Sequence, residues 1–363
     1  MSFARSSETD FSPSSQAVSE PERSVAASPP LRAVVFGCAG TVLSDQERAF
    51  FRRTNPLGFI LFRRNCDSPE QVRALVVDLR TTIGREDAPV LIDQEGGRVA
   101  RLRPPNWPEH PSARTFGELA GRNRAAGREA AWINARLLAE TLHELGINVD
   151  CAPVCDVPVP GAHDIIGDRA FAEDPQVVAE LARASCEGLL AGGVLPVIKH
   201  IPGHGRARSD SHDELPVVNS SFGSLNKSDF PPFRALADLP LGMVAHVVYA
   251  AIDHEQPAST SAKVISQVIR RDLGFNGLLF SDDLSMKALD GTLAERATAV
   301  LEAGCDIVLH CNGNAEEMAE IAAVTPELTG PSLARWLYAQ GFTRTPHPVN
   351  TVELRARLEA LLG

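Results

Sequence analysis

The most constraining feature of this sequence is a set of eight short apolar runs that alternate with longer segments of helical periodicity. Runs that are apolar throughout are typical of strands buried on both faces of a parallel sheet. We predict strands at Arg32–Gly37, Gly58–Phe62, Val90–Asp93, Ile147–Ala152, Val194–His200, Gly242–Val247, Gly277–Asp282 and Asp306–Cys311. Eight such strands with helices between them predict one α/β domain over residues 31–363, a closed (β/α)8 barrel.

An open, doubly wound sheet is the alternative architecture. No Gly-x-Gly-x-x-Gly motif follows the first run, so nothing in the sequence favours a dinucleotide-binding version of that sheet. We therefore expect the closed barrel.

The segments between the runs carry signals for the beginning and end of helices. One helix is predicted to begin with Ser68 as N-cap and Pro69 in its first turn and to end at Gly84. A second has Asp174 as its cap and stops at Gly192. Further helices are predicted over residues 121–146, 292–304 and 351–363.

Ionisable residues stand where several predicted strands end. The third strand ends in Asp93, the fifth in Lys199 and His200, and the seventh in Asp282, which Asp283 follows. A charge at the end of an apolar strand is costly unless it is paired or used. The active sites of (β/α)8 barrels lie at this end of the strands. We therefore predict a functional site there. The sequence leaves open whether His246, on the sixth strand, is a core or a functional residue.

Charge and composition exclude several classes of function. The net charge of −11 argues against a nucleic-acid partner, which would require a basic face. No apolar run approaches the roughly 20 residues of a membrane helix. Residues 1–30 are rich in Ser, Pro and Glu and resemble a disordered leader, without the apolar core of a signal peptide. Seven scattered cysteines indicate a reducing compartment, so we expect a cytoplasmic protein.

The segment Lys199–Glu214, KHIPGHGRARSDSHDE, has three interpretations. It is a metal site, a solvated polar loop, or a mobile catalytic loop. His200 and His204 are four residues apart, but Pro202 lies between them and excludes the helix that would place both on one face. Asp210 and His212 are two residues apart, and a carboxylate on one imidazole nitrogen raises the basicity of the other. We favour a catalytic loop in which His212 is a general acid and base.

The run LLFSDDLSM supplies the second half of this chemistry. An apolar strand delivers Asp282 and Asp283 to the rim, where one carboxylate is a candidate nucleophile. Asp283 is more simply interpreted as a residue that caps the next helix or anchors the turn. An aspartate nucleophile with a separate acid/base partner is the layout of a retaining glycosidase.

These motifs resemble a known family. IDQEGGRVARL, GDRAF, IKHIPGHGRARSDSHDELP, MVAHVVY, LGFNGLLFSDDLSM and EAGCDIVLHCN occur in the order found in the single-domain β-N-acetylglucosaminidases of bacterial peptidoglycan recycling (NagZ-type), in glycoside hydrolase family three. The resemblance spans roughly residues 34–312. Ile201, where Phe is usual, and Lys287, where an acid is common, depart from the pattern. Neither position belongs to the predicted catalytic group.

The resemblance implies a (β/α)8 barrel and the removal of terminal N-acetylglucosamine from anhydro-muropeptides. It implies that Asp282 is the nucleophile, His212 the acid/base and Asp210 the partner of His212. The implied sugar-binding residues are Asp93, Arg101, Arg169, Lys199 and His200. No metal or organic cofactor is implied, and we expect a monomer whose partner is a small-molecule substrate.

There are three rival functions, the first of which uses the same residues. A phosphorylase would let phosphate attack the glycosyl-enzyme, because a histidine acid/base repels phosphate less than a carboxylate does. A non-catalytic muropeptide sensor would keep the pocket but would not need Asp282, Asp210 and His212 together. A metallohydrolase would lose its activity to a chelator.

Overall fold

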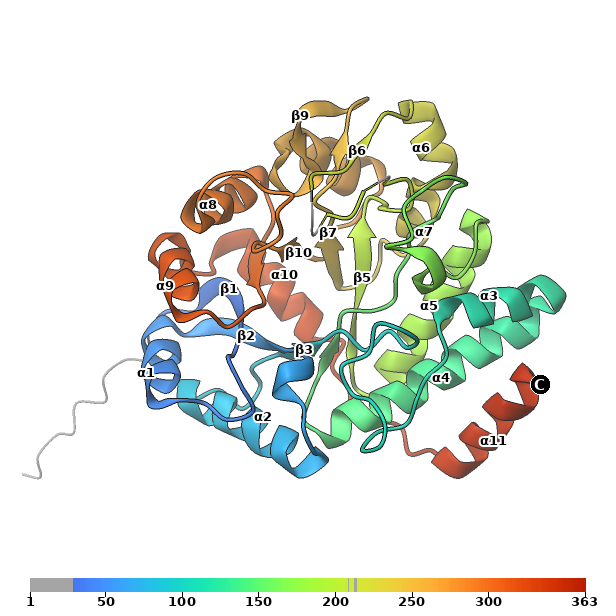
Figure 1. Ribbon diagram of the computed structural model, residues 1–363, viewed down its shortest axis with the longest axis horizontal. Coiled ribbons are helices and arrows are strands. Elements are labelled where there is room, and N and C mark those ends of the chain that lie inside the picture. Colours follow the sequence, from blue (N-terminus) through green and yellow to red (C-terminus); the bar gives the residue numbers. More distant parts are fainter. Residues whose placement is uncertain (1–28, 208, 212–213) are drawn as a thin grey trace, which may run out of the picture.

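Eight parallel strands close into a barrel in the computed structural model, which describes residues 29–207, 209–211 and 214–363 (Figure 1). The strands are β1 (Arg32–Gly37), β2 (Pro56–Leu61), β3 (Val90–Ile92), β4 (Val149–Asp150), β5 (Leu195–Ile201), β7 (Leu241–Val244), β10 (Leu278–Asp283) and β11 (Ile307–His310). Their order around the barrel is β1-β11-β10-β7-β5-β4-β3-β2. The predicted fold class is confirmed, and the open sheet is excluded.

The barrel closes between its first and last strands. Val34 on β1 lies opposite Val308 on β11, and β1 pairs on its other side with β2. Each predicted strand corresponds to one strand of the barrel, with ends that differ by a few residues. The largest difference is β4, predicted over six residues, which pairs regularly only at Val149 and Asp150. Pro153, which has no backbone N–H to donate, follows shortly after.

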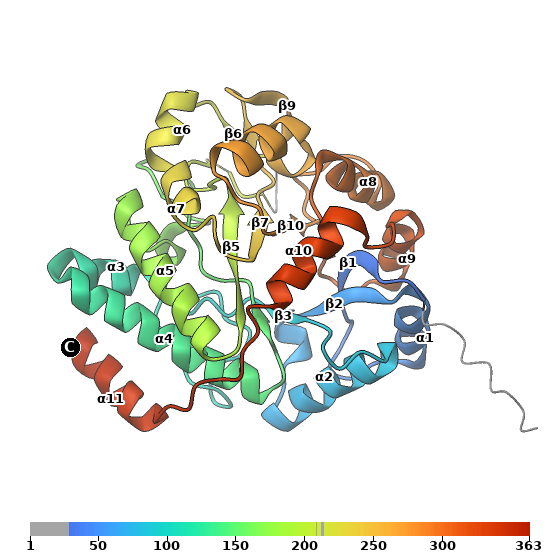
Figure 2. The same ribbon diagram turned by 180° about the vertical axis from the view of Figure 1, so that it is seen from behind.

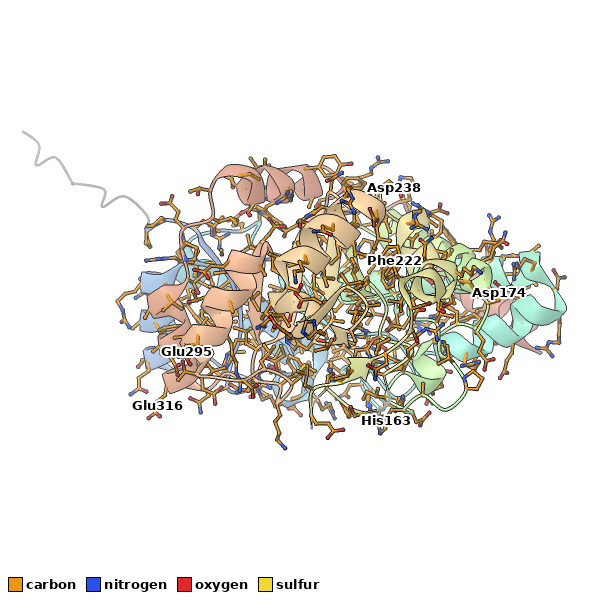
Figure 3. All side chains as sticks on the ribbon, turned by 90° about the horizontal axis from the view of Figure 1, so that it is seen from above. His163, Asp174, Phe222, Asp238, Glu295 and Glu316 are labelled. Atoms are coloured by element: carbon orange, nitrogen blue, oxygen red, sulfur yellow. The ribbon has the colours of Figure 1, made fainter. Side chains whose placement is uncertain are left out.

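Helices surround the barrel on its outside (Figure 1). They are α1 (Asp45–Thr54), α2 (Pro69–Ile83), α3 (Ala113–Arg122), α4 (Arg124–Glu144), α5 (Pro175–Ala191), α6 (Phe222–Ser228), α7 (Phe230–Ala235), α8 (Leu293–Ala303), α9 (Ala315–Val324), α10 (Gly330–Gln340) and α11 (Thr351–Leu362), with a π-helix, η4, at Val264–Asp272. Short 3-10 turns lie at Arg63–Asn65 (η1), Gly167–Arg169 (η2) and Ala258–Thr260 (η3). Figure 3 shows Glu295 on α8 and Asp174, which caps α5, on opposite sides of this ring.

The predicted helix caps of α2 and α5 are confirmed. Ser68 accepts the backbone N–H of Gln71, and Gly84 ends α2 in the left-handed conformation. Asp174 caps α5 by accepting the N–H of Gln176. The single helix predicted over residues 121–146 is wrong at its start, because Asn123 caps a new helix there and separates α3 from α4.

The barrel interior is packed with apolar side chains and sealed at one end. Leu328, with Trp336 and Ala339 of α10, joins the same buried cluster as the inward-facing strand residues Val35 and Leu241. Figure 2 shows α10 lying across the strands from behind. Figure 3 shows α10 and the loop that carries His163 on opposite sides of the molecule. The strands end on the side away from α10, so we expect a ligand site there.

A small second sheet was not predicted. It contains β6 (Val217–Val218), β8 (Val248–Tyr249) and β9 (Asp253–Pro257) in the order β6-β8-β9. Two-residue strands are too short to show a period in the sequence. Val217 pairs with Val248, so this sheet fixes the chain that returns from the loop after β5.

The remaining expectations concern the cysteines, membrane-spanning helices and the N-terminal leader. The seven cysteines are all buried and free. In the described part of the chain, no helix has both the length and the apolar character needed to cross a membrane. Residues 1–28 of the predicted leader lie outside the described residues.

Candidate active site

A cavity of about 250 Å³ opens at the carboxyl ends of the barrel strands. Side chains from the top of the barrel interior, including Ile60, Met243, Leu309 and Cys311, form its apolar floor. Its walls carry charged residues from the loops after β3 and β4 and from the carboxyl ends of β5 and β10. A small ligand with one apolar face and several hydroxyl groups matches this arrangement.

One wall is built on Asp93, which directly follows β3. Lys199 Nζ donates to Asp93 Oδ1 at 2.8 Å, and Arg101 Nη2 donates to Oδ2 at 2.9 Å. Burial alone would raise the pKa of Asp93, but Lys199 and Arg101 outweigh it and hold that pKa far below its usual range. The Arg101 guanidinium also lies over the Phe62 ring, 4.7 Å from its centre. Asp93 is therefore an ionised acceptor in a fixed position.

Glu95 extends this wall and links Lys199 to Arg169. Arg169 binds both Glu95 oxygens, at 2.8 and 2.9 Å, and Lys199 Nζ lies 2.7 Å from Glu95 Oε1. Burial works to raise the pKa of Glu95, but Arg169 and Lys199 lower it to about 2. Arg169 is thus a buried, bidentate partner rather than a surface ion pair.

His200 and His204 follow Lys199 into the cavity wall. Their rings meet edge to face, with centres 5.6 Å apart. His200 Nδ1 lies 2.7 Å from Oδ2 of Asp156, a fully buried residue behind the wall. Burial lowers the pKa of His204 to about 4, and the neighbouring His200 adds to this effect. His204 is therefore neutral at physiological pH.

Asp282, near the end of β10, faces the histidines across the cavity. Its Oδ1 accepts the backbone N–H of Asp283 at 2.8 Å. Burial would raise the pKa of Asp282, but the nearby charge of His200 contributes most to lowering it, so the carboxyl is ionised at neutral pH. Asp283 accepts from the N–H and hydroxyl of Ser285 and from the N–H of Cys311. Asp283 therefore anchors the turn, and the expectation that it caps the next helix is wrong, because Thr292 caps α8.

The structure supports the core interpretation of His246. Its ring is fully buried, with Nδ1 2.7 Å from Ser259 Oγ and Nε2 3.1 Å from the carbonyl of Asp283. Burial lowers the pKa of His246, so the ring is neutral. It supports the backbone beneath Asp282 without lining the described part of the cavity.

The loop after β5 supplies the last part of the wall. Ser211 lines the cavity, and its hydroxyl lies 3.3 Å from His204 Nε2. Asp210 precedes it in the chain, although Asp210 is not among the described residues that line the cavity. His212 lies outside the described residues. The predicted pairing of Asp210 with His212 therefore stays a prediction.

The structure brings together most of the predicted site residues. Six of them line one cavity: Asp93, Arg101, Arg169, Lys199, His200 and Asp282. Sequence reasoning did not select Glu95, Asp156, His204 or Ser211 as site residues. Glu95 stands two residues beyond a strand end already marked by Asp93, and that position was the available signal. Asp156 gave no such signal, because an irregular segment separates it from β4.

The structure gives no support to a metal site in the histidine segment within the described part of the chain. No group of three or more His, Cys, Asp or Glu side chains there is arranged to hold an ion. His200 Nδ1 is occupied by Asp156, and His204 Nε2 faces Ser211.

Comparisons with known proteins give matches over most of the chain. Residues 36–332 match the family described as Glycosyl hydrolase family 3 N terminal domain. A β-hexosaminidase of Bordetella avium is 39% identical over 299 residues, which cover 81% of this chain and 85% of that protein. A β-hexosaminidase of Alkalilimnicola ehrlichii is 41% identical over 283 residues, covering 77% of this chain and 80% of the relative.

Solved structures show the same relationship. The crystal structure of NagZ from Neisseria gonorrhoeae in complex with N-trifluoroacetyl-D-glucosamine has a TM-score of 0.82 and 33% identity, covering 92% of this chain and 99% of that chain. A glycoside hydrolase family 3 β-N-acetylglucosaminidase from Paenibacillus has a TM-score of 0.81 and 29% identity, covering 91% of this chain and 66% of the other.

Proposed function

This chain belongs to glycosyl hydrolase family 3, and from that premise we propose that it is a retaining exo-β-N-acetylglucosaminidase acting on anhydro-muropeptides. It is a glycoside hydrolase that acts on N-acetylhexosamine, as its β-hexosaminidase relatives are named. We further propose that it works in the cytoplasm as a monomer, in the recycling of cell-wall fragments.

The mechanism rests on one observation: each carboxylate of the cavity has different partners and therefore a different role. Lys199 holds both Asp93 and Glu95 ionised, together with Arg101 on Asp93 and Arg169 on Glu95, so neither can donate a proton at neutral pH. Asp283 is occupied by the turn that follows it. Among the described residues this leaves Asp282 as the nucleophile and no carboxyl as the acid. A histidine acid next in the chain to Ser211, which lines the cavity, would complete the site.

In the proposed reaction, Asp282 attacks the anomeric carbon as His212, oriented by Asp210, protonates the leaving oxygen. The bond from the anomeric carbon to the aglycone breaks, and a covalent glycosyl-Asp282 forms. Water then gives its proton to His212 and attacks the same carbon, which releases N-acetylglucosamine and frees Asp282. Asp93, Arg101, Arg169, Lys199 and His200 would hold the sugar hydroxyls.

The test is release of nitrophenol from para-nitrophenyl N-acetyl-β-D-glucosaminide, by the wild type and by Asp282→Asn, with a chelator present. We expect release by the wild type and a loss of roughly 10⁴-fold or more in the variant. A chelator-sensitive rate would favour a metallohydrolase. Added phosphate should leave free N-acetylglucosamine as the product, whereas a sugar phosphate would identify a phosphorylase. A folded wild type that binds N-acetylglucosamine without cleaving the glycoside or an anhydro-muropeptide would be a sensor.

A further inference from the structure

Asp156 contacts both histidines of the cavity wall from behind. Its side chain is fully buried and lies outside the described cavity lining. Oδ2 accepts from His200 Nδ1 at 2.7 Å, and Oδ1 accepts the backbone N–H groups of His204 at 2.7 Å and of His200 at 3.2 Å. One carboxylate thus receives three hydrogen bonds from a five-residue stretch.

This contact fixes the state of the His200 ring. Burial would raise the pKa of Asp156, but His200 outweighs it and keeps the carboxylate ionised. An ionised carboxylate can only accept hydrogen bonds, so His200 Nδ1 must carry the proton. Nε2 is then the ring nitrogen left to meet a ligand. His200 and Asp282 line the same cavity, so the orientation of this ring shapes the surroundings of the proposed nucleophile.

The same carboxylate also holds the beginning of the segment that carries Asp210. Its Oδ1 fixes the backbone of His204, whose ring lies 3.3 Å from the Ser211 hydroxyl. We propose that Asp156 is a positioning residue for hydrolysis, which sets the tautomer and orientation of the His200 ring and ties the sugar pocket to the segment before Ser211. This inference rests on the proposed function.

A purely structural role for Asp156 is the rival explanation, and the chain offers a matched control. Asp229 is also a buried acid that anchors the loop after β5, because Arg206 Nε donates to its Oδ2 at 2.7 Å. Within the part of the chain that the structure describes, its side chain accepts from Arg206 and Ser228, neither of which lines the cavity. A loss of anchoring without an effect on His200 is therefore expected from Asp229→Asn.

The test is a double-mutant cycle on glycoside hydrolysis. We expect Asp156→Asn to lower kcat/KM by about 10- to 100-fold in the wild-type background, the range found when an orienting carboxylate behind a ligand histidine is removed. In a His200→Gln background the same change should cost less than in the wild type, because only the contact of Asp156 with the His204 backbone is then left to lose. Equal losses in the two backgrounds would overturn the proposal. Asp229→Asn should lower kcat/KM by the same factor in the wild-type and His200→Gln backgrounds. A different factor in the two backgrounds for this control would also overturn the proposal.

A second readout does not depend on activity. Nitrogen-15 NMR of the imidazoles should show His200 protonated on Nδ1 in the wild type and in Asp229→Asn, and a change of this state in Asp156→Asn. An unchanged His200 signal in a folded Asp156→Asn protein would overturn the proposal. If the wild type hydrolyses nothing, the proposed function fails while the NMR result still decides the role of Asp156. If the wild type is active but the cycle shows no coupling, only this inference fails.

Discussion

Two clusters of buried charge stand at opposite ends of the barrel, and they are built by the same rules. At the amino end, Asp306 precedes β11 and is 2% exposed. It accepts from Arg270, Arg335 and Ser332 at 2.9, 2.7 and 2.6 Å, and from the backbone N–H of Leu279 at 2.9 Å. Each oxygen is satisfied, as a buried carboxylate requires. This cluster joins η4, α10 and two strands.

The cluster at the carboxyl end is paired in the same way, except that Arg101 Nε has no hydrogen-bond partner among the described residues. Lys199 lies between Asp93 and Glu95, and Arg101 and Arg169 complete the set. This second cluster forms the wall of a cavity, and Asp306 lines none of it. Paired buried charge is therefore not itself a sign of function in this molecule. Its position at the carboxyl ends of the strands is the sign.

The largest expected effect comes from Lys199→Met. This change leaves two buried carboxylates short of a cation, so we expect a loss of about 3–5 kcal/mol in the free energy of unfolding. We also expect kcat/KM to fall about 10- to 100-fold, the value of a hydrogen bond to a charged group. Urea unfolding and nitrophenol release measure the two losses. N-acetylglucosamine should raise the Tm of the wild type and not that of the variant. Full activity in this variant would remove Lys199 from the sugar pocket.

Asp306→Asn should lower the stability of the protein and leave its activity nearly unchanged. It weakens two arginine contacts at the far end of the barrel, so we expect a loss of about 2–4 kcal/mol in the free energy of unfolding. At a temperature where the variant is fully folded, kcat and KM should stay within about 3-fold of wild type. A larger kinetic effect would show that the two ends of the barrel are coupled and would contradict the comparison.

Acid should weaken the cavity cluster in a defined pH range. The pKa of Glu95 is lowered to about 2 in the folded protein. Its stabilising contribution is complete above the unfolded pKa of about 4.3 and is lost as pH falls toward 2. Glu95→Gln should therefore reduce the slope of unfolding free energy against pH in this range, by about 2–3 kcal/mol in total. Identical slopes in the two proteins would show that Glu95 is not held by Arg169 and Lys199.

Asp150 on β4 is a buried acid without a cation on it, and it should behave in the opposite way. Its Oδ1 accepts the N–H of Gln94, and its Oδ2 has no hydrogen-bond partner within the part of the chain that the structure describes. Burial raises its pKa well above the usual value, so the folded state loses stability as pH rises from about 4. Asp150→Asn should raise the free energy of unfolding by about 1 kcal/mol at pH 8 and leave it unchanged near pH 4. A loss at pH 8 would contradict this reasoning.

The sequence predicted the barrel because each strand is a continuous apolar run that ends at a turn. For the same reason it predicted Asp93, Lys199 and Asp282, which are charges at strand ends. Arg101 and Arg169 came from the family resemblance, since nothing in their spacing shows which acid they meet. Glu95 was missed although it stands two residues beyond a strand end, and Asp156 was missed because its partners His200 and His204 are 44 and 48 residues away in the chain. The pairing of Asp156 with His200 exists only after β4 and β5 lie side by side.

The seam between β1 and β11 has a consequence for how the protein is made. Val34 and Val308 are about 270 residues apart. Protein synthesis adds about 5–20 residues per second, so β11 is synthesised roughly 15–55 s after β1. Until then β1 and β10 keep unpaired edges, which are sites for wrong association. The barrel and its cavity can therefore be completed only after the last strand has been synthesised.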